Sequence, residues 1–443
     1  MTDPDSNPQP HETTISCLSR IVRAEDAGAP AAARAWLRTA GLFAASAVVL
    51  FLRRPDAFSR AQFYAEDGKS WYAQAYHLGA VAPFLMPQDG YFQTLPRIAA
   101  LVAQALPLAH APLCMNLFGL VVQIAPILLL LSPRFDGVLP SARLRLLLSL
   151  FYALQPNGAE MHVTITMAGW RLALLALMVI VADAPRTRAG TVYDVCVLAL
   201  SAISGPFAIL LAPAAAVSWA HKRDARGLRV VAILAAGAGL QGVSFLFVES
   251  GRPSAPLEPS LSAFVRIIGG QLGIGALLGD RGYTWLQQTV RLPVSLLSLL
   301  TLGVGGVFAA AIVRGPRALR VLAVYSLLIL SAALISPTAS RTQPQWDLLS
   351  LPRIAARYWF VPSICLVVSL GWIFRSQRRR VVRITVAACL ASLAVGVVWN
   401  ARRLPYRDLG FAARAARFER ATAGSVHRFP IPPARWFMEL KKR

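Results

Sequence analysis

Residues 61–79, which follow the first long hydrophobic run, hold the side chains best suited to chemistry. Glu66 and Asp67 are adjacent there, so their side chains point to different sides of any regular element. One carboxylate can therefore face a substrate while the other binds protein groups or a cation. A partly desolvated carboxylate has a raised pKa and can act as a general base on a hydroxyl group. The competing interpretation is a solvent-exposed turn at Asp67 and Gly68.

Aromatic and polar residues near this acidic pair are candidates for substrate binding. Aromatic rings combined with amide and carboxylate partners suit a sugar ring. The competing interpretation for each ring is the aromatic belt that membrane proteins have at the bilayer surface. The candidates in this part of the chain are Tyr64, Trp71, Asp89, Gln93 and Arg97.

A later polar turn places Glu160 and His162 two residues apart. A carboxylate and an imidazole at this spacing could jointly transfer a proton or bind a divalent cation. A solvated pair in a loop is an equally good interpretation. The two residues are therefore candidates for a supporting catalytic role.

Arg171 follows about nine residues into an expected membrane span, which is ~13 Å of helix. A charge at that depth usually faces a partner or a polar cavity. We expect Glu160, Asp67 or a ligand phosphate to be the partner of Arg171. The alternative is that its long side chain reaches back to the membrane surface.

Arginines also gather in a late segment that the span assignment places outside, against the usual positive-inside trend. Arg341, Arg353 and Arg357 belong to it, and an anionic partner is expected for them. Arg357 and Tyr358 stand at the head of a span, where the guanidinium group can bind a phosphate through forked hydrogen bonds. Lipid headgroups are the alternative partner.

The elements that must position these residues are membrane helices. The 443-residue chain is 56% hydrophobic, whereas about 45 to 50% is usual for a soluble domain. Continuous apolar runs such as residues 113–131 and 292–313 are long enough to cross about 30 Å of hydrocarbon as helix. They lack the alternating pattern of a membrane β-barrel. The sequence therefore predicts an all-α, polytopic transmembrane bundle.

The net charge of +24 comes from short basic clusters that lie between the apolar runs. This distribution indicates membrane topology and argues against nucleic-acid binding. It predicts a cytoplasmic N-terminus, a periplasmic C-terminus and about eleven spans, of which 144–156, 191–204 and 205–220 are short. The expected spans are 36–53, 113–131, 144–156, 163–182, 191–204, 205–220, 228–248, 292–313, 319–336, 358–374 and 384–399.

The expected organisation has three parts. Residues 1–35 form a disordered cytoplasmic tail, 36–399 the transmembrane domain with a periplasmic first loop at 54–112, and 400–443 a periplasmic tail. Interfacial helices are expected at 94–109 and 261–280. The tail could fold back over the outer face or extend as a surface arm. The five cysteines have no metal-binding or disulfide spacing, and neither a metal nor a cofactor is expected.

Three features together resemble the GT-C superfamily of polytopic membrane glycosyltransferases: an acidic pair after the first span, a further acid in a second outer turn, and an R-Y-x-F-x-P span head. The FYAEDG motif and the closing FPIPPARWFMEL are similar to a bacterial branch of it. The resemblance implies a polyprenyl-phosphate-linked sugar as donor and an essential acid in the first outer loop. It implies a base at Asp67 or Glu66, support from Glu160 or His162, and carrier-phosphate contacts from Arg357, Tyr358 and Arg171.

The predicted function is transfer of a sugar from this carrier to an envelope glycan or lipid acceptor, at the periplasmic face of a bacterial inner membrane. Membrane lipids are the other expected partners, and no nucleic acid is expected. The alternative is a transporter or lipid flippase in which Arg171, Glu160 and His162 line an outward-facing charged cavity. A polysaccharide polymerase or ligase would need a larger late loop than 337–357.

Overall fold

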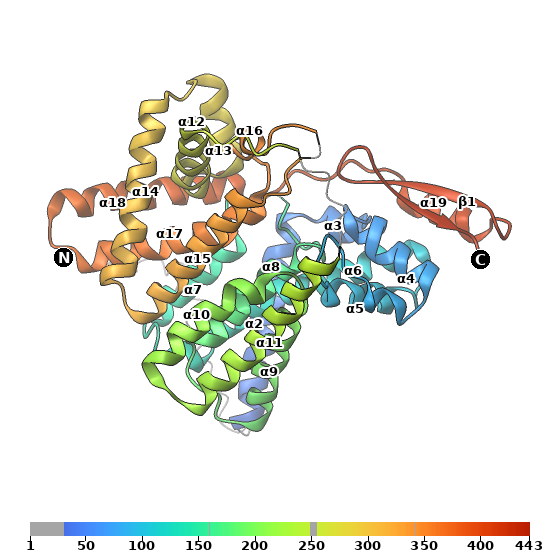
Figure 1. The fold of residues 1–443 in the computed structure, drawn as a ribbon, viewed down its shortest axis with the longest axis horizontal. Coiled ribbons are helices and arrows are strands. Elements are labelled where there is room, and N and C mark those ends of the chain that lie inside the picture. The colour runs from blue at the N-terminus through green and yellow to red at the C-terminus, as the bar shows by residue number, and fades with distance from the viewer. Residues whose placement is uncertain (1–30, 159, 249–254, 341) are drawn as a thin grey trace, which may run out of the picture.

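The computed structural model describes residues 31–158, 160–248, 255–340 and 342–443. Helices dominate this part of the chain, and one two-stranded hairpin is the sheet found within it (Figure 1). The expected polytopic helical class is therefore confirmed in outline. Residues 1–30 of the tail expected at 1–35 lie outside the described residues. Arg341 lies outside them too.

The first half of the chain contains the loop at residues 54–112. Short helical turns make up most of that loop, and longer helices precede and follow it. They are α2 (Ala31–Arg53), α3 (Asp56–Ser59), η1 (Asp67–Tyr72), α4 (Ala73–Leu78), η2 (Ala82–Leu85), α5 (Thr94–Ala103), η3 (Leu108–His110), α6 (Ala111–Leu131), η4 (Pro133–Phe135), α7 (Ala142–Ala153), α8 (Ala168–Val181), α9 (Arg188–Ala202), α10 (Phe207–Lys222) and α11 (Ala225–Phe247).

The second half adds a further group of helices and the C-terminal hairpin. Helix α15 packs on α17, and α13 packs on α18. The elements are α12 (Leu261–Val265), η5 (Arg266–Gly275), α13 (Ala276–Thr289), α14 (Val294–Arg314), α15 (Arg317–Ile335), α16 (Gln345–Leu349), α17 (Ala356–Ser376), α18 (Arg380–Asn400), α19 (Phe411–Glu419), β1 (Val426–Ile431) and β2 (Trp436–Lys441).

Local capping explains where three of the helices begin. The side chains of Ser141, Thr187 and Asp224 accept hydrogen bonds from the first-turn N–H groups of α7, α9 and α11. These groups have no partner inside the helix, so a side-chain oxygen before the helix stabilises its start. All three caps lie in the turns that the basic clusters assign to the cytoplasm.

Eight helical segments in the described part of the chain are long and apolar enough to cross a membrane. Seven of them coincide with expected spans. The expected spans 144–156, 163–182, 191–204 and 205–220 are helices of fewer than 18 residues. The eighth long segment, Leu261–Thr289, was not expected to be a span.

The segment Leu261–Thr289 differs from the interfacial helix expected at 261–280. It is long enough to cross a bilayer and is helical on both sides of Gly279, and its middle, η5, is a π-helix. Gly279 breaks it with a φ of 75°, a left-handed conformation that favours glycine. At Gly269 a Cβ atom would overlap the Leu297 carbonyl oxygen of α14, so only glycine permits this approach. This kink agrees with the expectation that the segment does not form a straight span.

The C-terminal segment folds back on the loop that follows α2. Strands β1 and β2 pair antiparallel, and β2 contacts η1 and α4. The Ala65 N–H donates to the Pro432 carbonyl at 2.6 Å, and the Phe63 and Phe411 rings meet edge to face at 5.2 Å. In Figure 1 the hairpin and α19 lie beyond α4 at the right of the molecule. Of the two expectations for the tail, folding back is the one observed.

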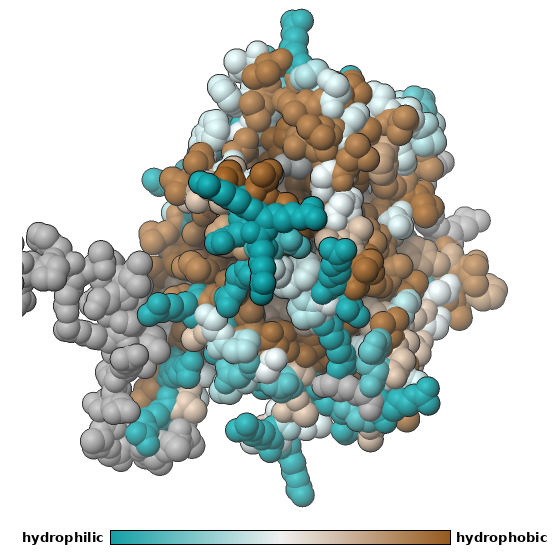
Figure 2. Space-filling view, turned by 90° about the vertical axis from the view of Figure 1, so that its left-hand side faces the viewer, coloured by the Kyte–Doolittle hydropathy of each residue, from teal (hydrophilic) through white to brown (hydrophobic). Residues whose placement is uncertain are grey.

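The outside of the helical bundle is hydrophobic. Phe247 of α11, Leu302 of α14 and Val398 of α18 are 81%, 74% and 76% exposed. Figure 2 shows one side of the molecule on which hydrophobic residues cover most of the surface and hydrophilic ones gather near the middle. Such extended apolar surfaces are unusual on soluble monomers and suit contact with lipid.

Candidate active site

Asp67 is the first residue of the π-helix η1, a geometry that occurs often at functional sites. Its side chain is buried, at 1% exposure. Its Oδ1 atom accepts hydrogen bonds from the N–H of Thr166 at 2.9 Å and from the Thr166 hydroxyl at 2.6 Å. Its Oδ2 atom has no hydrogen-bond partner among the described residues. Asp67 thus joins the first outer loop to the turn between α7 and α8.

Burial raises the pKa of Asp67 to about 7, because a carboxylate is poorly solvated there. The hydrogen bonds from Thr166 oppose this rise, and the charge of Glu66 adds to it. A carboxyl group with this pKa exchanges its proton near neutral pH. Solvent does not reach it in this structure, so its direct neighbours alone can exchange with it.

Glu66 lies next to Asp67 and differs from it in being partly exposed. Burial raises the pKa of Glu66, and the nearby charges of Asp89 and Glu160 raise it further. The Glu66 N–H and the cationic Arg357 act in the opposite direction. The two members of the acidic pair therefore differ in environment: Asp67 is buried, whereas Glu66 is partly exposed and is influenced by the charges of Asp89, Glu160 and Arg357.

Glu160 and Arg357 form an ion pair within this group of charged residues, the acidic cluster. The Arg357 Nη1 atom lies 3.3 Å from a Glu160 carboxylate oxygen, and the Arg357 backbone N–H donates to the same oxygen at 2.8 Å. Nη2 of Arg357 donates to the Thr338 carbonyl at 2.8 Å. Both side chains keep 15 to 18% exposure. The start of α17 is thereby held against the turn between α7 and α8.

Tyr358 adds a phenolic group beside this ion pair. The Arg357 guanidinium lies 4.8 Å from the Tyr358 ring centroid. The Tyr358 hydroxyl accepts a hydrogen bond from the Thr338 N–H at 2.9 Å. The expected phosphate-binding pair thus sits beside Glu160 in this structure, with Arg357 already bonded to a carboxylate.

Two tyrosines form an aromatic wall at the same place. The Tyr64 and Tyr406 ring centroids lie 5.3 Å apart, and the Arg54 guanidinium lies 4.1 Å from the Tyr406 centroid. Burial raises the pKa of both tyrosines, so both stay neutral. The charges of Glu160 and Glu66 also raise the pKa of Tyr64.

Other expected substrate-binding residues have structural contacts. Trp71 donates its indole N–H to the Thr166 hydroxyl at 3.1 Å, and the Arg97 guanidinium lies 5.2 Å from the Trp71 ring centroid. Arg97 is 2% exposed and donates to the Gln74 side chain and the Met86 carbonyl. Both side chains are buried and thus shielded from a substrate, and Arg97 supports η1 through its contact with the Trp71 ring.

Three further expected residues are Asp89, Gln93 and Arg353, and they have separate surroundings. Asp89 occupies a tight turn with a φ of 55° and adds its charge to the surroundings of Glu66. Gln93 forms a backbone bridge with Ser204. Arg353 is exposed, with a φ of 70°, in the segment before α17. Asp89 is therefore the one of these three that acts on the acidic pair.

His162 does not share a site with Glu160. It is 2% exposed, and neither ring nitrogen has a hydrogen-bond partner among the described residues. Burial lowers its pKa, and four nearby arginines lower it further, so it is neutral. The expectation of a joint Glu160 and His162 centre is wrong, because one faces Arg357 and the other is enclosed by cations.

Neither of the two carboxylates expected as partners of Arg171 is bonded to it, and the expected ligand phosphate stays a prediction. Arg171 is 3% exposed and donates to the Met161 carbonyl and to the Tyr152 hydroxyl. Its guanidinium lies 5.3 Å from the Phe360 ring centroid. Neither Glu160 nor Asp67 pairs with it. Carbonyl and aromatic partners satisfy this charge without a carboxylate.

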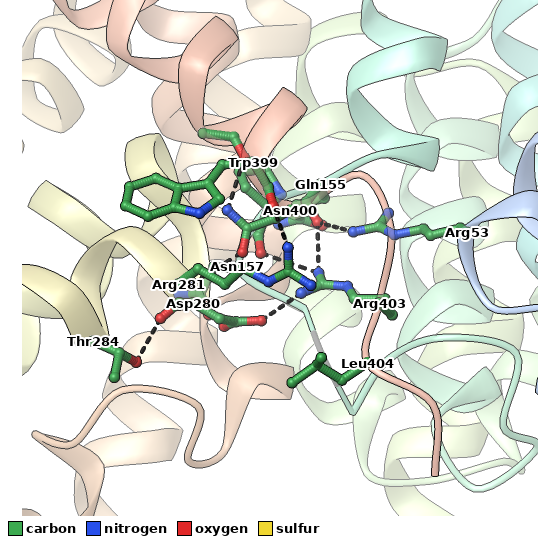
Figure 3. A network of polar contacts seen from close by, with 12 residues as sticks. Arg53, Gln155, Asn157, Asp280, Arg281, Thr284, Trp399, Asn400, Arg403 and Leu404 are labelled. Carbon is green, nitrogen blue, oxygen red and sulfur yellow. Dashed lines mark hydrogen bonds and ion pairs between the residues drawn. The ribbon is translucent and has the colours of Figure 1, made fainter.

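A buried arginine network contacts the start of the turn between α7 and α8, and Figure 3 shows its residues. Arg53 from the end of α2 and Arg403 after α18 both donate to the Gln155 carbonyl, at 2.5 and 2.9 Å. Arg403 also pairs with Asp280 of α13 at 2.5 Å, and side-chain exposures are 5% and 2%. The network joins three distant parts of the chain at the base of the turn.

The residues that the sequence analysis missed are Thr166, Tyr406 and this network. Thr166 is one of many threonines, and nothing in its neighbourhood separates it from them. A usable signal existed for the arginines, because Arg53 and Arg54 end a span on the side expected to be outside. Charges on that side are unusual and call for a partner.

No group of three or more His, Cys, Asp and Glu side chains in the described ranges is arranged to hold a metal ion. Carboxylates, guanidinium groups and phenols therefore make up the chemistry that these residues can supply: proton transfer, binding of an anion and stacking on a sugar ring.

No family model matches the chain, and no curated protein or solved structure is similar to it. Its class therefore rests on its own features. Eight long apolar helices in the described part of the chain and an apolar exterior are those of a multi-pass membrane protein.

Proposed function

We propose that the protein is a membrane glycosyltransferase of the GT-C type. It transfers a sugar from a polyprenyl-phosphate carrier to an envelope glycan or lipid acceptor on the periplasmic face of a bacterial inner membrane. The observation that supports this best is the ion pair of Glu160 with Arg357, whose charges act on the partly exposed Glu66 carboxyl group. These residues are far apart in the chain, and together they supply a base and a cation for an anionic donor.

Glu66 acts as the general base in this proposal. It is the accessible carboxylate of the acidic pair, and its raised pKa makes it a stronger base than an ordinary glutamate. It takes the proton of the acceptor hydroxyl as that oxygen bonds to the anomeric carbon. The bond from this carbon to the carrier phosphate breaks, and the phosphate leaves with the electron pair. Direct displacement inverts the anomeric configuration.

Asp67 positions the site without meeting the sugar. Its hydrogen bonds to Thr166 hold the turn that bears Glu160 against η1. Arg357 binds the carrier phosphate, sharing its guanidinium between that group and Glu160. Arg353, which is exposed near the start of α17, supplies a second cation. The Tyr64 and Tyr406 wall offers a face for the sugar ring.

The topology in this proposal has about eleven spans, the N-terminus in the cytoplasm and the C-terminus in the periplasm. Basic clusters then lie at every cytoplasmic turn. Leu261–Thr289 enters and leaves the membrane on the periplasmic side. Its kink at Gly279 supports this, as does the hydrogen bond of 2.8 Å from the Gln271 side chain to the Leu351 carbonyl in the segment before α17. The acidic cluster faces the same side.

The experiment compares Glu66→Gln, Asp67→Asn and Glu439→Gln in a deletion strain, with mass analysis of polyprenyl-linked intermediates and envelope glycans. Glu439 is an exposed carboxylate of β2 and serves as the matched control. We expect Glu66→Gln to lose about 10²- to 10⁴-fold in rate, the usual range for a general base. A carrier-linked sugar then accumulates, and the glycan lacks one residue.

Full restoration of the glycan by Glu66→Gln would exclude the proposal. A second assay separates transfer from transport. A transferase still forms product in detergent-solubilised membranes, where no leaflet has to be crossed. A transporter or flippase makes no product there and leaves the carrier-linked sugar unchanged.

A further inference from the structure

A large apolar cavity lies at the opposite end of the helices from the acidic cluster. Its volume is about 800 Å³, and α6, α7, α8, α15 and α17 contribute to its wall. Leu130, Leu177, Leu319 and Val367 are typical of the side chains that line it. An apolar cavity of this size is well suited to a hydrocarbon chain.

The mouth of this cavity is basic. Arg375 and Ser376 line the cavity and also line a second, open hollow, whose other residues are Phe374, Gln377, Arg378 and Arg383. The two spaces therefore meet at the end of α17.

The charges at the mouth lack acidic partners. Arg375, Arg378 and Arg383 are exposed, and no described carboxylate lies within 4 Å of them. By contrast, Arg134 and Arg145 on the same side of the bundle pair with Asp194 and Asp136. The cations of the mouth are available to an anion in a way that their neighbours are not.

The length of the cavity fits a lipid of the adjacent leaflet whose headgroup lies at the cavity mouth. The wall extends along α17 from Ile364 to Ser376, which is ~18 Å of helix and more than half of the ~30 Å hydrocarbon core. Tyr152 lines the inner end, and its hydroxyl is bonded to Arg171. The cavity therefore reaches from the headgroup level toward the middle of the bilayer.

We propose that this cavity binds one anionic phospholipid, with its phosphate at Arg375, Arg378 and Arg383 and one acyl chain between α7, α8, α15 and α17. Basic residues at the cytoplasmic surface attract anionic lipids, which are enriched in that leaflet. The phosphate lies at the far end of the helices from Glu66, so the occupant is a lipid of the bilayer and not the sugar carrier. The proposal does not depend on the transferase activity.

The test uses protein in nanodiscs of phosphatidylcholine with a minor share of phosphatidylglycerol, analysed by native mass spectrometry. The headgroup variant is Arg375→Gln with Arg378→Gln. Its matched control is Arg379→Gln with Arg380→Gln, in the same turn but outside the hollow. We expect one retained phosphatidylglycerol in the wild-type protein and about thirtyfold less in the headgroup variant, which is the loss that two juxtamembrane charges account for.

The chain variant is Gly371→Leu. Gly371 lines the cavity, and a Cβ atom there meets nothing within 4 Å, so the leucine enters the cavity without disturbing the backbone. Its control is Gly303→Leu on α14, where a Cβ atom also has open space. We expect Gly371→Leu to lose the lipid and Gly303→Leu to keep it. Both variants replace a helical glycine and should fold.

Retention of phosphatidylglycerol by both lipid-site variants would overturn the proposal. So would equal retention of phosphatidylcholine, since the basic mouth would then have no role. Displacement of phosphatidylglycerol by added undecaprenyl phosphate at an equal amount would assign the cavity to the carrier and overturn it as well.

Discussion

The arginines at the two ends of the helical bundle differ in their burial and in their bonding partners. At the end near the acidic cluster, Arg53, Arg171 and Arg403 are buried and bonded to carbonyl groups or to Asp280. At the end of α17, Arg375 and Arg378 are exposed and have no acidic partner among the described residues. Buried charges must be paired because desolvation is costly. Exposed charges are solvated without a protein partner and remain available to bind a ligand.

This comparison shows that the number of arginines in a segment says little about their role. Burial separates arginines that hold a turn in place from arginines that can bind. Arg357 lies between the two groups, since it is bonded to Glu160 yet keeps part of its surface exposed. It is the arginine of the acidic cluster best placed to exchange a protein partner for a ligand.

The largest effect is expected from breaking the buried pair. Asp280→Ala leaves Arg403 buried without its carboxylate, and loss of one partner of such a pair costs about 3 to 5 kcal/mol. The matched control is Glu439→Ala, whose partner Arg428 is well exposed and whose pair contributes about 1 kcal/mol or less. Thermal unfolding of the detergent-solubilised variants measures both. Equal melting temperatures would mean that the buried network does not hold the turn.

The next effect is a pH dependence of stability from Asp67. In the unfolded chain this carboxyl releases its proton near its ordinary pKa of 3.8, whereas in the folded protein it keeps the proton up to about 7. Stability is therefore highest at low pH, falls as the pH rises through 7, and then stays level. The pKa difference corresponds to at most about 4 kcal/mol.

Asp67→Asn removes this titration and keeps an oxygen that accepts from Thr166. We expect the variant to be more stable than the wild type above pH 7 and to lack the decline between pH 4 and 7. Melting temperatures across this pH range measure it, with Asp347→Asn as the control. An unchanged decline in the Asp67→Asn variant would show that another group titrates.

A smaller effect is expected on the pH dependence of sugar transfer. Arg357 lowers the pKa of Glu66 through its positive charge, so Arg357→Gln raises it. Activity needs the deprotonated base, and the acidic limb of the pH profile should therefore move to higher pH. Arg60→Gln, an exposed arginine of the same loop, should leave the limb in place. A limb that does not move with Arg357→Gln would separate Glu66 from the reaction.

The smallest effect is expected at the basic mouth. Arg375→Gln with Arg378→Gln removes exposed charges that have no acidic partner among the described residues, and surface substitutions of this kind change stability by about 0.5 kcal/mol or less. Its melting temperature in detergent without anionic lipid should match that of the wild type. A large loss would mean that these arginines hold the fold, as those at the other end do.

Much of the architecture could be predicted from the sequence. Runs such as 113–131 and 292–313 are apolar over the length of a bilayer, and hydropathy is a local property that needs no knowledge of neighbours. The short helices and the π-helices were harder. A segment such as Leu261–Thr289 has the composition of a span, and its glycines allow a kink whose position depends on α14 and α18.

The site was predicted in part. The division of labour in the acidic pair follows from adjacency alone, and the structure places Glu66 and Asp67 on different sides. The surroundings of Arg171 and His162 were not predictable. Carbonyl groups and aromatic rings satisfy Arg171, and such partners occur everywhere in a chain and leave no mark in its sequence. The arginines around His162 come from distant segments.

By itself the sequence determined a helical membrane protein with its basic residues in turns and an acidic pair after the first long helix. Apolar length and charge distribution are enough for that, since each acts locally. The tertiary structure alone decided which carboxylate of the acidic pair is buried and which arginine acts through its charge on the other carboxylate. It also decided that the C-terminal hairpin packs on the first loop. Pairing depends on which surfaces come together, and that choice is made by the packing of distant helices.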